Sequence, residues 1–121
     1  MTQQRQEFGK EGEDIAVREL ERRGYEILAR RYRTRYGEID IVASDTGTIV
    51  FIEVKARATD EFGTAAEAVT ASKQRRLASM ATDYLARNRL TDRPCRFDVV
   101  AIDGMDDARR IVVFQGAFGV W

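Results

Sequence analysis

The sequence contains no histidine, and this absence excludes several kinds of active site at once. Without imidazole there is no Ser–His or Cys–His nucleophile system and no histidine-ligated zinc site. The single cysteine, Cys95, cannot form an internal disulfide or a two-thiolate metal site, so nothing indicates an oxidising compartment. Any chemistry carried by this chain therefore depends on carboxylates, lysine, arginine and hydroxyl groups.

Long apolar runs are lacking as well. Residues 1–14 contain no apolar core segment of the kind found in a signal peptide, and every apolar stretch is far shorter than a membrane span of about 20 residues. There is one proline, and there is no low-complexity segment or internal repeat. A length of 121 residues suits one compact domain. We therefore expect a single cytoplasmic domain over residues 1–121, with no membrane partner.

Net charge is also lacking, because 20 basic residues balance 20 acidic ones. The charges are nevertheless segregated along the chain. Residues 22–35 hold six arginines and one acid, and residues 73–96 hold seven basic residues and two acids. Such segregation permits a basic face suited to phosphate contact, although charge alone favours the alternative of a mixed, solvated surface.

Hydrophobic periodicity predicts an α/β fold in which two helices flank a mixed sheet of about five strands. Apolar residues at helical spacing precede Gly24, a typical residue after a helix end, and a second amphipathic stretch starts at Thr70 or Ser72. Alternating or β-branched runs predict the strands. The expected order is α-β-β-β-α-β-β, with helices at 7–23 and about 72–89, strands at 25–33, 37–44, 48–57, 97–103 and 110–118, and a loop with a short helical piece at 58–69.

The most informative stretch is a predicted hairpin formed by residues 37–57. A polar turn at Thr46-Gly47 would place residue i opposite residue 93 − i. Asp40 would then face Glu53, with Cβ atoms about 4.5–5.5 Å apart, and Glu38 would face Lys55. The pairing depends on the turn, because a loop with an odd number of residues would shift the register and break it.

Opposed carboxylates on a central strand pair repel each other and need compensation. Magnesium, or manganese in its place, is typically held by one or two carboxylates, keeps several waters and joins substrate phosphates. Lys55, on the same strand face as Glu53, would lie beside the ion and orient or deprotonate a water, or stabilise charge on phosphorus. The alternative is a structural ladder of ion pairs, which spacing alone does not exclude.

These residues resemble a known nuclease pattern. The Asp of GEIDIVA at 37–43, followed by IVFIEVKAR at 49–57, is similar to the PD-(D/E)-x-K superfamily, although Gly37-Glu38-Ile39-Asp40 replaces its Pro-Asp. The chain as a whole resembles the small bacterial YraN-like family of predicted endonucleases, which is distantly similar to archaeal Holliday junction resolvases. The resemblance also covers GKEGEDIA at 9–16, FG at 62–63, KQRRL at 73–77 and RFDVVAI at 96–102.

The resemblance implies a restriction-endonuclease-like core. Asp40 and Glu53 would be metal ligands, the backbone carbonyl of Val54 a further ligand, and Lys55 the catalytic lysine. Glu13 matches a helix acid that approaches the metal in resolvase-like relatives; alternatively it is a solvated acid near a helix start. Because those relatives act as dimers on branched DNA, the resemblance also implies a homodimer.

Several basic residues are candidates for contact with a nucleic-acid backbone. They are Arg31, Arg33, Arg35, Arg57, Lys73, Arg75 and Arg76. Tyr36 and Phe62 are candidates for stacking on bases, but core packing or a loop anchor is the favoured explanation of both aromatic residues.

Three functions remain open from the sequence. The first is a metal-dependent nuclease that hydrolyses phosphodiester bonds in DNA, with branched or structured DNA as candidate substrates. The second is a nucleic-acid-binding module of the same fold with little or no activity, which net neutrality favours. The third is an interaction protein whose charged strand residues form only an ion-pair ladder.

Overall fold

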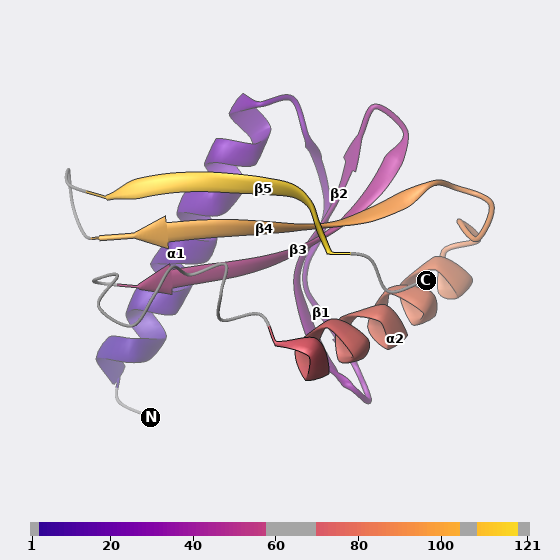
Figure 1. Cartoon of the computed structure of the whole chain (residues 1–121), viewed down its shortest axis with the longest axis horizontal. Coiled ribbons are helices and arrows are strands. Elements are labelled where there is room, and N and C mark those ends of the chain that lie inside the picture. Colours follow the sequence, from indigo (N-terminus) through magenta and orange to yellow (C-terminus); the bar gives the residue numbers. More distant parts are fainter. Residues whose placement is uncertain (1–2, 58–69, 105–108, 119–121) are drawn as a thin grey trace.

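The computed structural model describes residues 3–57, 70–104 and 109–118, without the side chains of residues 3–9 and 57. Two helices lie on opposite sides of a five-stranded sheet whose spatial order is β1-β2-β3-β4-β5 (Figure 1). The element order is the predicted α-β-β-β-α-β-β. The elements are α1 (Gln3–Arg22), β1 (Glu26–Thr34), β2 (Gly37–Asp45), β3 (Thr48–Arg57), α2 (Ala71–Arg87), β4 (Cys95–Asp103) and β5 (Arg110–Phe118).

The differences from the predicted bounds are confined to element ends. Helix α1 begins at Gln3, four residues before the expected start, because a polar sequence without proline can extend a helix beyond its apolar stripe. Helix α2 begins after Thr70, whose hydroxyl accepts the Lys73 N–H as an N-cap. The predicted loop at 58–69 lies outside the described residues. No helix in the described ranges has the length and apolarity needed to cross a membrane.

The sheet is mixed because β3 and β4 run parallel while the other neighbours run antiparallel. Parallel strands require a long crossover, and helix α2 lies within the one that connects them. The β2–β3 hairpin turns at Thr46-Gly47, which have positive φ values of 53° and 90°, as a type I′ turn requires. This turn fixes the register that places Ile41 opposite Ile52, so the predicted 93 − i pairing is confirmed from Asp45 to Ile41.

Two hydrophobic clusters show why the central strands are apolar on both faces. One cluster packs α1 residues against alternate residues of β2, β3 and β4, including Ile41, Ile52 and Ile102. The other packs α2 residues against the intervening positions, including Phe51 and Phe97. Side chains alternate along a strand, so the two clusters occupy opposite faces of the sheet.

Helix α1 lies close to strand β3 at Gly12. A Cβ atom placed on Gly12 would lie 2.7 Å from the Cβ of Ala56 on β3, closer than packed side chains tolerate. The missing side chain therefore lets the backbone of α1 lie directly against β3.

Replacement of Gly12 by alanine is expected to lower the free energy of unfolding by about 1–2 kcal/mol. Overpacking costs roughly 1–3 kcal/mol, and the better helix propensity of alanine offsets up to about 1 kcal/mol. Urea denaturation measures the change. The double variant Gly12→Ala/Ala56→Gly removes the opposing Cβ and should recover part of the loss; a single variant as stable as the parent chain would contradict this contact.

Candidate functional site

Strands β2 and β3 separate beyond Ile41 and Ile52, where their ladder of paired residues ends. Strand β2 continues to pair with β1, while β3 continues to pair with β4 as far as Arg57 (Figure 1). At this fork the Val54 N–H donates to Oδ2 of Asp40 at 2.8 Å, so a side-chain oxygen replaces a backbone acceptor. The hydrogen bond fixes Asp40 against the strand that carries Glu53 and Lys55.

The fork opens on the α2 side into a hollow of about 170 Å³. Both predicted acids line it, Asp40 from β2 and Glu53 from β3. The two carboxylates therefore share one side of the sheet, although the pair itself lies one position past the regular ladder. The hollow is lined by Gly37, Glu38, Asp40, Glu53, Lys73, Arg76, Leu77 and Met80.

Two lysines contact the same oxygen of Glu53. Lys55 Nζ lies 3.3 Å and Lys73 Nζ 3.7 Å from Oε1 of Glu53, whose side chain is 13% exposed. Lys73 comes from the first turn of α2, so the helix start delivers a cation to the strand acids. Lys73 therefore lines the hollow together with the acids, and Arg76 lines it one helical turn further along α2. The contact of both residues with a nucleic-acid backbone stays a prediction.

The pKa values of three side chains at the fork depart from their ordinary values, that of Asp40 by the most. Burial, aided by the negative charge of Glu53, raises the pKa of Asp40 to about 7, although the Val54 N–H opposes the shift. Burial works against the charged form of Lys55, but its hydrogen bond with Lys73 and the charge of Glu53 raise the pKa of Lys55 on balance. Burial and the neighbouring Lys55 lower the pKa of Lys73. Shifts of this kind gather at functional sites, and also at structural ion-pair networks.

The expected opposition of Glu38 and Lys55 is wrong. Lys55 pairs with Glu53 on its own strand, while Glu38 faces Arg33 of β1, with a contact of 3.3 Å. The prediction assumed that the hairpin ladder continues to the strand ends, whereas the strands separate first.

Glu13 is buried on α1, and its carboxylate lies between two arginines of β1. Arg30 donates to Oε1 at 3.0 Å, and Arg31 donates to Oε2 at 3.2 Å. Its charge also contributes to the raised pKa of Asp40, so the helix acid acts electrostatically on the fork. The alternative that Glu13 is a solvated helix acid is therefore wrong. The direct approach of Glu13 to a metal stays a prediction.

The pairing of Glu13 depends on an unusual backbone conformation that no sequence pattern indicates. Adjacent strand residues point to opposite faces, yet Arg30 and Arg31 reach the same carboxylate. Arg31 has a φ of 53°, which turns its side chain to the α1 side. A non-glycine residue in this region costs on the order of 1–3 kcal/mol, and such strain concentrates at functional sites.

The remaining basic candidates lie in different places. Arg33 is highly exposed beside Glu38, and Arg75 is exposed on α2. Arg35 lies in the β1–β2 turn, next to a second hollow described below. Arg57 is the last residue of β3, and its side chain, like Phe62, lies outside the described residues.

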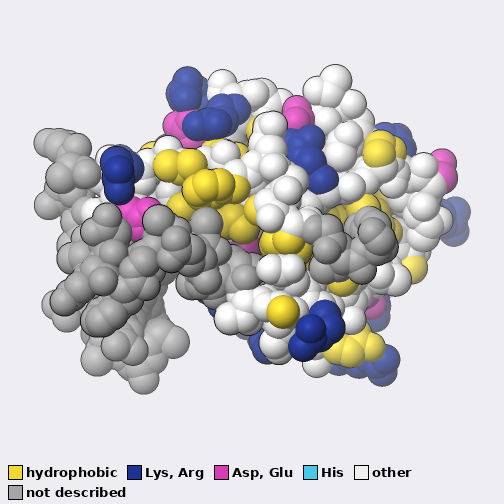
Figure 2. Space-filling view, viewed as in Figure 1, with side chains coloured by type: hydrophobic (Ala, Val, Ile, Leu, Met, Phe, Trp, Pro, Cys, Tyr) yellow, Lys and Arg dark blue, Asp and Glu magenta, His cyan; other side chains and the backbone are white. Residues whose placement is uncertain are grey.

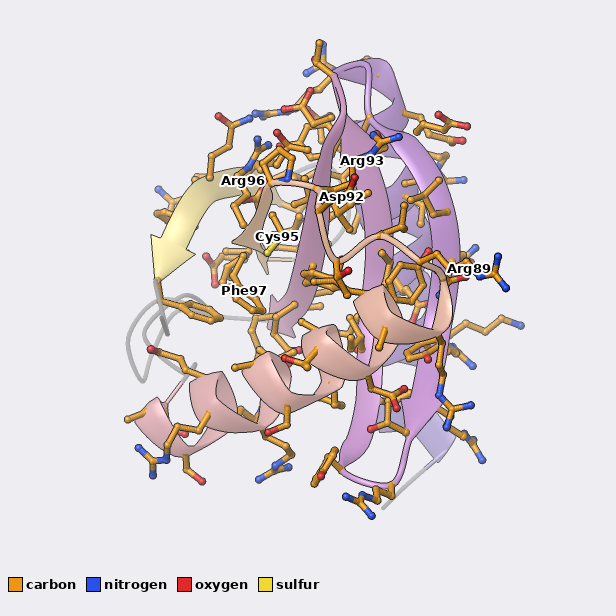
Figure 3. The ribbon with its side chains drawn as sticks, turned by 90° about the vertical axis from the view of Figure 1, so that its right-hand side faces the viewer. Arg89, Asp92, Arg93, Cys95, Arg96 and Phe97 are labelled. Atoms are coloured by element: carbon orange, nitrogen blue, oxygen red, sulfur yellow. The ribbon has the colours of Figure 1, made fainter. Side chains whose placement is uncertain are left out.

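Sequence reasoning missed a second, buried polar network at the other end of the sheet. Asp98 of β4 is completely buried and accepts hydrogen bonds from Tyr25 Oη (2.9 Å), Arg96 Nε (3.0 Å) and the Gly116 N–H (2.9 Å). Arg96 also donates to Asp45 at 2.8 Å. Figure 3 shows the neighbours Phe97 and Arg96 diverging, with Phe97 toward α2 and Arg96 farther from it. Apart from Arg96, the residues that donate to Asp98 are distant from it in sequence, so no local sequence motif indicates the network.

The site fits a divalent cation in its chemistry. Asp40 and Glu53 supply the one or two carboxylates that magnesium typically takes from a protein. Within residues 3–57, 70–104 and 109–118, no group of three or more acidic or cysteine side chains gathers to hold a metal. A cation at the fork would therefore complete its shell with water, substrate oxygens or backbone carbonyls, as magnesium commonly does.

Comparison with known proteins places the chain in a family. Residues 12–102 match the family described as "Uncharacterised protein family UPF0102". A UPF0102 protein of Symbiobacterium thermophilum is 50% identical over 111 residues, covering 91% of this chain and 94% of its own. One from Ralstonia pickettii is 50% identical over 117 residues (93% and 90%), and one from Pelotomaculum thermopropionicum is 41% identical over 120 residues (98% and 100%). The matched segment contains Glu13, Asp40, Glu53, Lys55 and Lys73, and the chain belongs to the UPF0102 family.

Proposed function

We propose that this protein is a metal-dependent nuclease that hydrolyses phosphodiester bonds in DNA. The observation that carries the proposal is the fork itself: two partly buried acids, Asp40 and Glu53, line one hollow together with Lys73 and Arg76, and Lys55 contacts Glu53. Carboxylates that could hold a metal ion thus lie beside basic side chains that could contact a phosphate. Metal-assisted phosphodiester hydrolysis uses this combination of groups.

Asp40 and Glu53 would hold magnesium or manganese, and the carbonyl of Val54 is the further ligand that the family resemblance implies. The bound ion would polarise the scissile phosphate and lower the pKa of an attacking water. The Val54 N–H keeps Asp40 oriented toward the hollow without any ion. The raised pKa of Asp40 indicates that burial and the charge of Glu53 destabilise its ionised form. A bound cation would relieve this destabilisation.

Lys55 has a separate role in this proposal. Its side chain is 21% exposed, and its ammonium contacts Glu53. The ammonium would orient the attacking water or stabilise negative charge on the phosphorus oxygens. Lys73 and Arg76, from α2, would contact the phosphate on the opposite wall of the hollow. Glu13 and its two arginines would act through Asp40 as positioning and electrostatic groups.

The test is cleavage of labelled DNA by the purified protein with Mg²⁺ or Mn²⁺, on single-stranded, nicked, flap and four-way substrates. Lys55→Ala is expected to lower the rate on any cleaved substrate by about 10²–10³-fold, because removal of one charge-stabilising group typically costs that much. Lys10→Ala, which removes an exposed lysine of α1, is the matched control and should retain the parent rate. The proposal fails if the parent protein leaves all four substrates intact.

A second candidate function is DNA binding without catalysis. One observation favours it: Lys55 and Lys73 already supply counter-charges to Glu53 within the chain. In that case DNA binding would depend on salt and would be unaffected by Asp40→Asn, and calorimetric titration would detect no binding of a divalent ion at the fork.

A further inference from the structure

A second hollow, of about 340 Å³, lies between the β1–β2 turn and helix α2. In Figures 1 and 3 this turn lies beside α2. The turn contributes Thr34, Arg35 and Tyr36, and α2 contributes Ser79, Thr82, Asp83 and Arg87. The nuclease proposal assigns no role to this hollow.

The two hollows follow each other along α2. The helix residues of the first hollow run from Lys73 to Met80, and those of the second run from Ser79 to Arg87. The mean positions of the two sets of α2 residues differ by about six residues, which is roughly 9 Å along the helix at 1.5 Å per residue. That distance corresponds to about two or three nucleotides at the 3.4 Å spacing of a stacked strand.

The chemistry of the second hollow differs from that of the first. Its one acid, Asp83, accepts from Tyr32 Oη at 2.7 Å and pairs with Arg87 at 3.1 Å, so its charge is compensated. Ser79 and Thr82 donate to backbone carbonyls of α2 and keep lone pairs available as acceptors. Hydroxyls, a compensated ion pair and an aromatic ring suit a nucleobase better than a phosphate.

Tyr36 is the aromatic ring of this hollow and is 42% exposed. The Arg35 guanidinium lies over the ring, 4.9 Å from its centre, and donates to Tyr36 Oη at 2.7 Å. An exposed aromatic ring backed by a guanidinium is a platform on which an unpaired base can stack. Core packing of Tyr36, one of the alternatives expected from the sequence, is excluded by this exposure.

The platform is preorganised by the turn that carries it. Thr34 Oγ1 accepts the Tyr36 N–H at 3.0 Å and donates to the Gly37 carbonyl at 3.1 Å. Gly37 has a φ of 132°, a conformation that side-chain-bearing residues rarely adopt. A fixed turn lowers the entropic cost of binding a flexible strand.

We propose that Tyr36, supported by Arg35, stacks on an unpaired base two or three nucleotides from the phosphate held at the fork. Resting on the nuclease function proposed above, this inference defines the substrate class as DNA with a single-stranded segment adjoining the cleavage site, such as a flap or a splayed junction, in preference to continuous duplex.

The test uses binding, so that it does not depend on cleavage. An oligonucleotide carrying 2-aminopurine, a base whose fluorescence is quenched by stacking, is titrated with the protein in EDTA, as single strand, as flap and as blunt duplex. The parent protein should quench the unpaired probe and bind single strand or flap at least tenfold more tightly than duplex. Tyr36→Ala should remove the quenching and weaken binding about 5- to 150-fold, given roughly 1–3 kcal/mol per stacked base.

Two further variants separate stacking from folding and from general hydrophobic contact. Tyr36→Trp should restore the quenching. Phe114→Ala removes a comparably exposed aromatic residue, 37% exposed on β5, where hydrophobic side chains gather in Figure 2, and should behave as the parent does. Equal binding of single strand and duplex, or unchanged quenching in Tyr36→Ala, would overturn the inference even in an active nuclease. If Tyr36→Ala lost the quenching while neither the parent protein nor any variant cleaved DNA, the stacking inference would be supported and the nuclease proposal refuted.

Discussion

Asp40→Asn is expected to stabilise the folded protein at pH 8 without divalent cations and to abolish cleavage. The stabilisation follows from the pKa of Asp40, which burial and Glu53 raise from its ordinary value of 3.8 to about 7. Between these two values the folded state binds a proton that the unfolded state has lost. The free energy of unfolding therefore falls as pH rises through this window and stays low above it.

Asparagine removes the charge and retains an oxygen for the Val54 N–H. The expected gain is on the order of 1–3 kcal/mol at pH 8, with a smaller gain at pH 5, where folded Asp40 is mostly protonated. Thermal unfolding in EDTA at both pH values measures it. Asp92→Asn, which neutralises an exposed acid after α2, is the control and should change stability little at either pH.

Asp40→Asn should also differ from the parent protein in how its thermal stability responds to a divalent cation. A cation that binds only the folded state raises the melting temperature in proportion to the logarithm of its concentration. Mg²⁺ or Mn²⁺ should therefore stabilise the parent protein and leave Asp40→Asn nearly unaffected, and cleavage should fall by at least about 10³-fold because a ligand is lost. A variant that is less stable at pH 8 and still responds to Mg²⁺ would contradict the assignment of Asp40.

Asp98→Ala is expected to have the largest effect on stability. The carboxylate is completely buried and serves Tyr25, Arg96 and Gly116, so its removal leaves three donors short of an acceptor. Loss of one partner from a buried ion pair typically costs about 3–5 kcal/mol, a large share of the roughly 5–15 kcal/mol that stabilises a domain. Urea denaturation of the parent and the variant gives the difference directly.

Asp45→Ala is the matched control for that experiment. It removes the other acid bound to Arg96, but its side chain is 26% exposed, so water replaces much of the lost interaction. The expected cost is about 1 kcal/mol or less. If Asp98→Ala lowered stability by no more than Asp45→Ala does, the network would not have the role that its burial indicates.

The sequence predicted the parts of the fold that depend on short-range rules. Alternation and a glycine-containing turn placed Asp40 and Glu53 on one face, because the hairpin between them is short and its register is set by two residues with positive φ. The helix between β3 and β4 was likewise predicted from local periodicity, and the parallel pairing of these two strands in the structure requires such a crossover.

The features that it did not predict depend on tertiary structure. The hairpin separates at Ile41 and Ile52, which breaks the alternation argument for Glu38. Arg31 adopts a strained φ that a residue-type pattern does not encode, and this conformation pairs it with Glu13. Asp98 and Tyr25 are 73 residues apart, so their contact becomes visible only when the sheet is assembled.

The bare backbone contact at Gly12 has a consequence for the geometry of the fork. Its chain neighbour is Glu13, and the residue it touches, Ala56, is the chain neighbour of Lys55. The spacing between the helix acid and the strand lysine is thus set by the Gly12 backbone against the Cβ of Ala56, with no rotatable side chain in between that could absorb an error. A displacement of α1 toward the sheet would therefore displace β3 as well, so the helix and the strand are expected to move as a rigid unit.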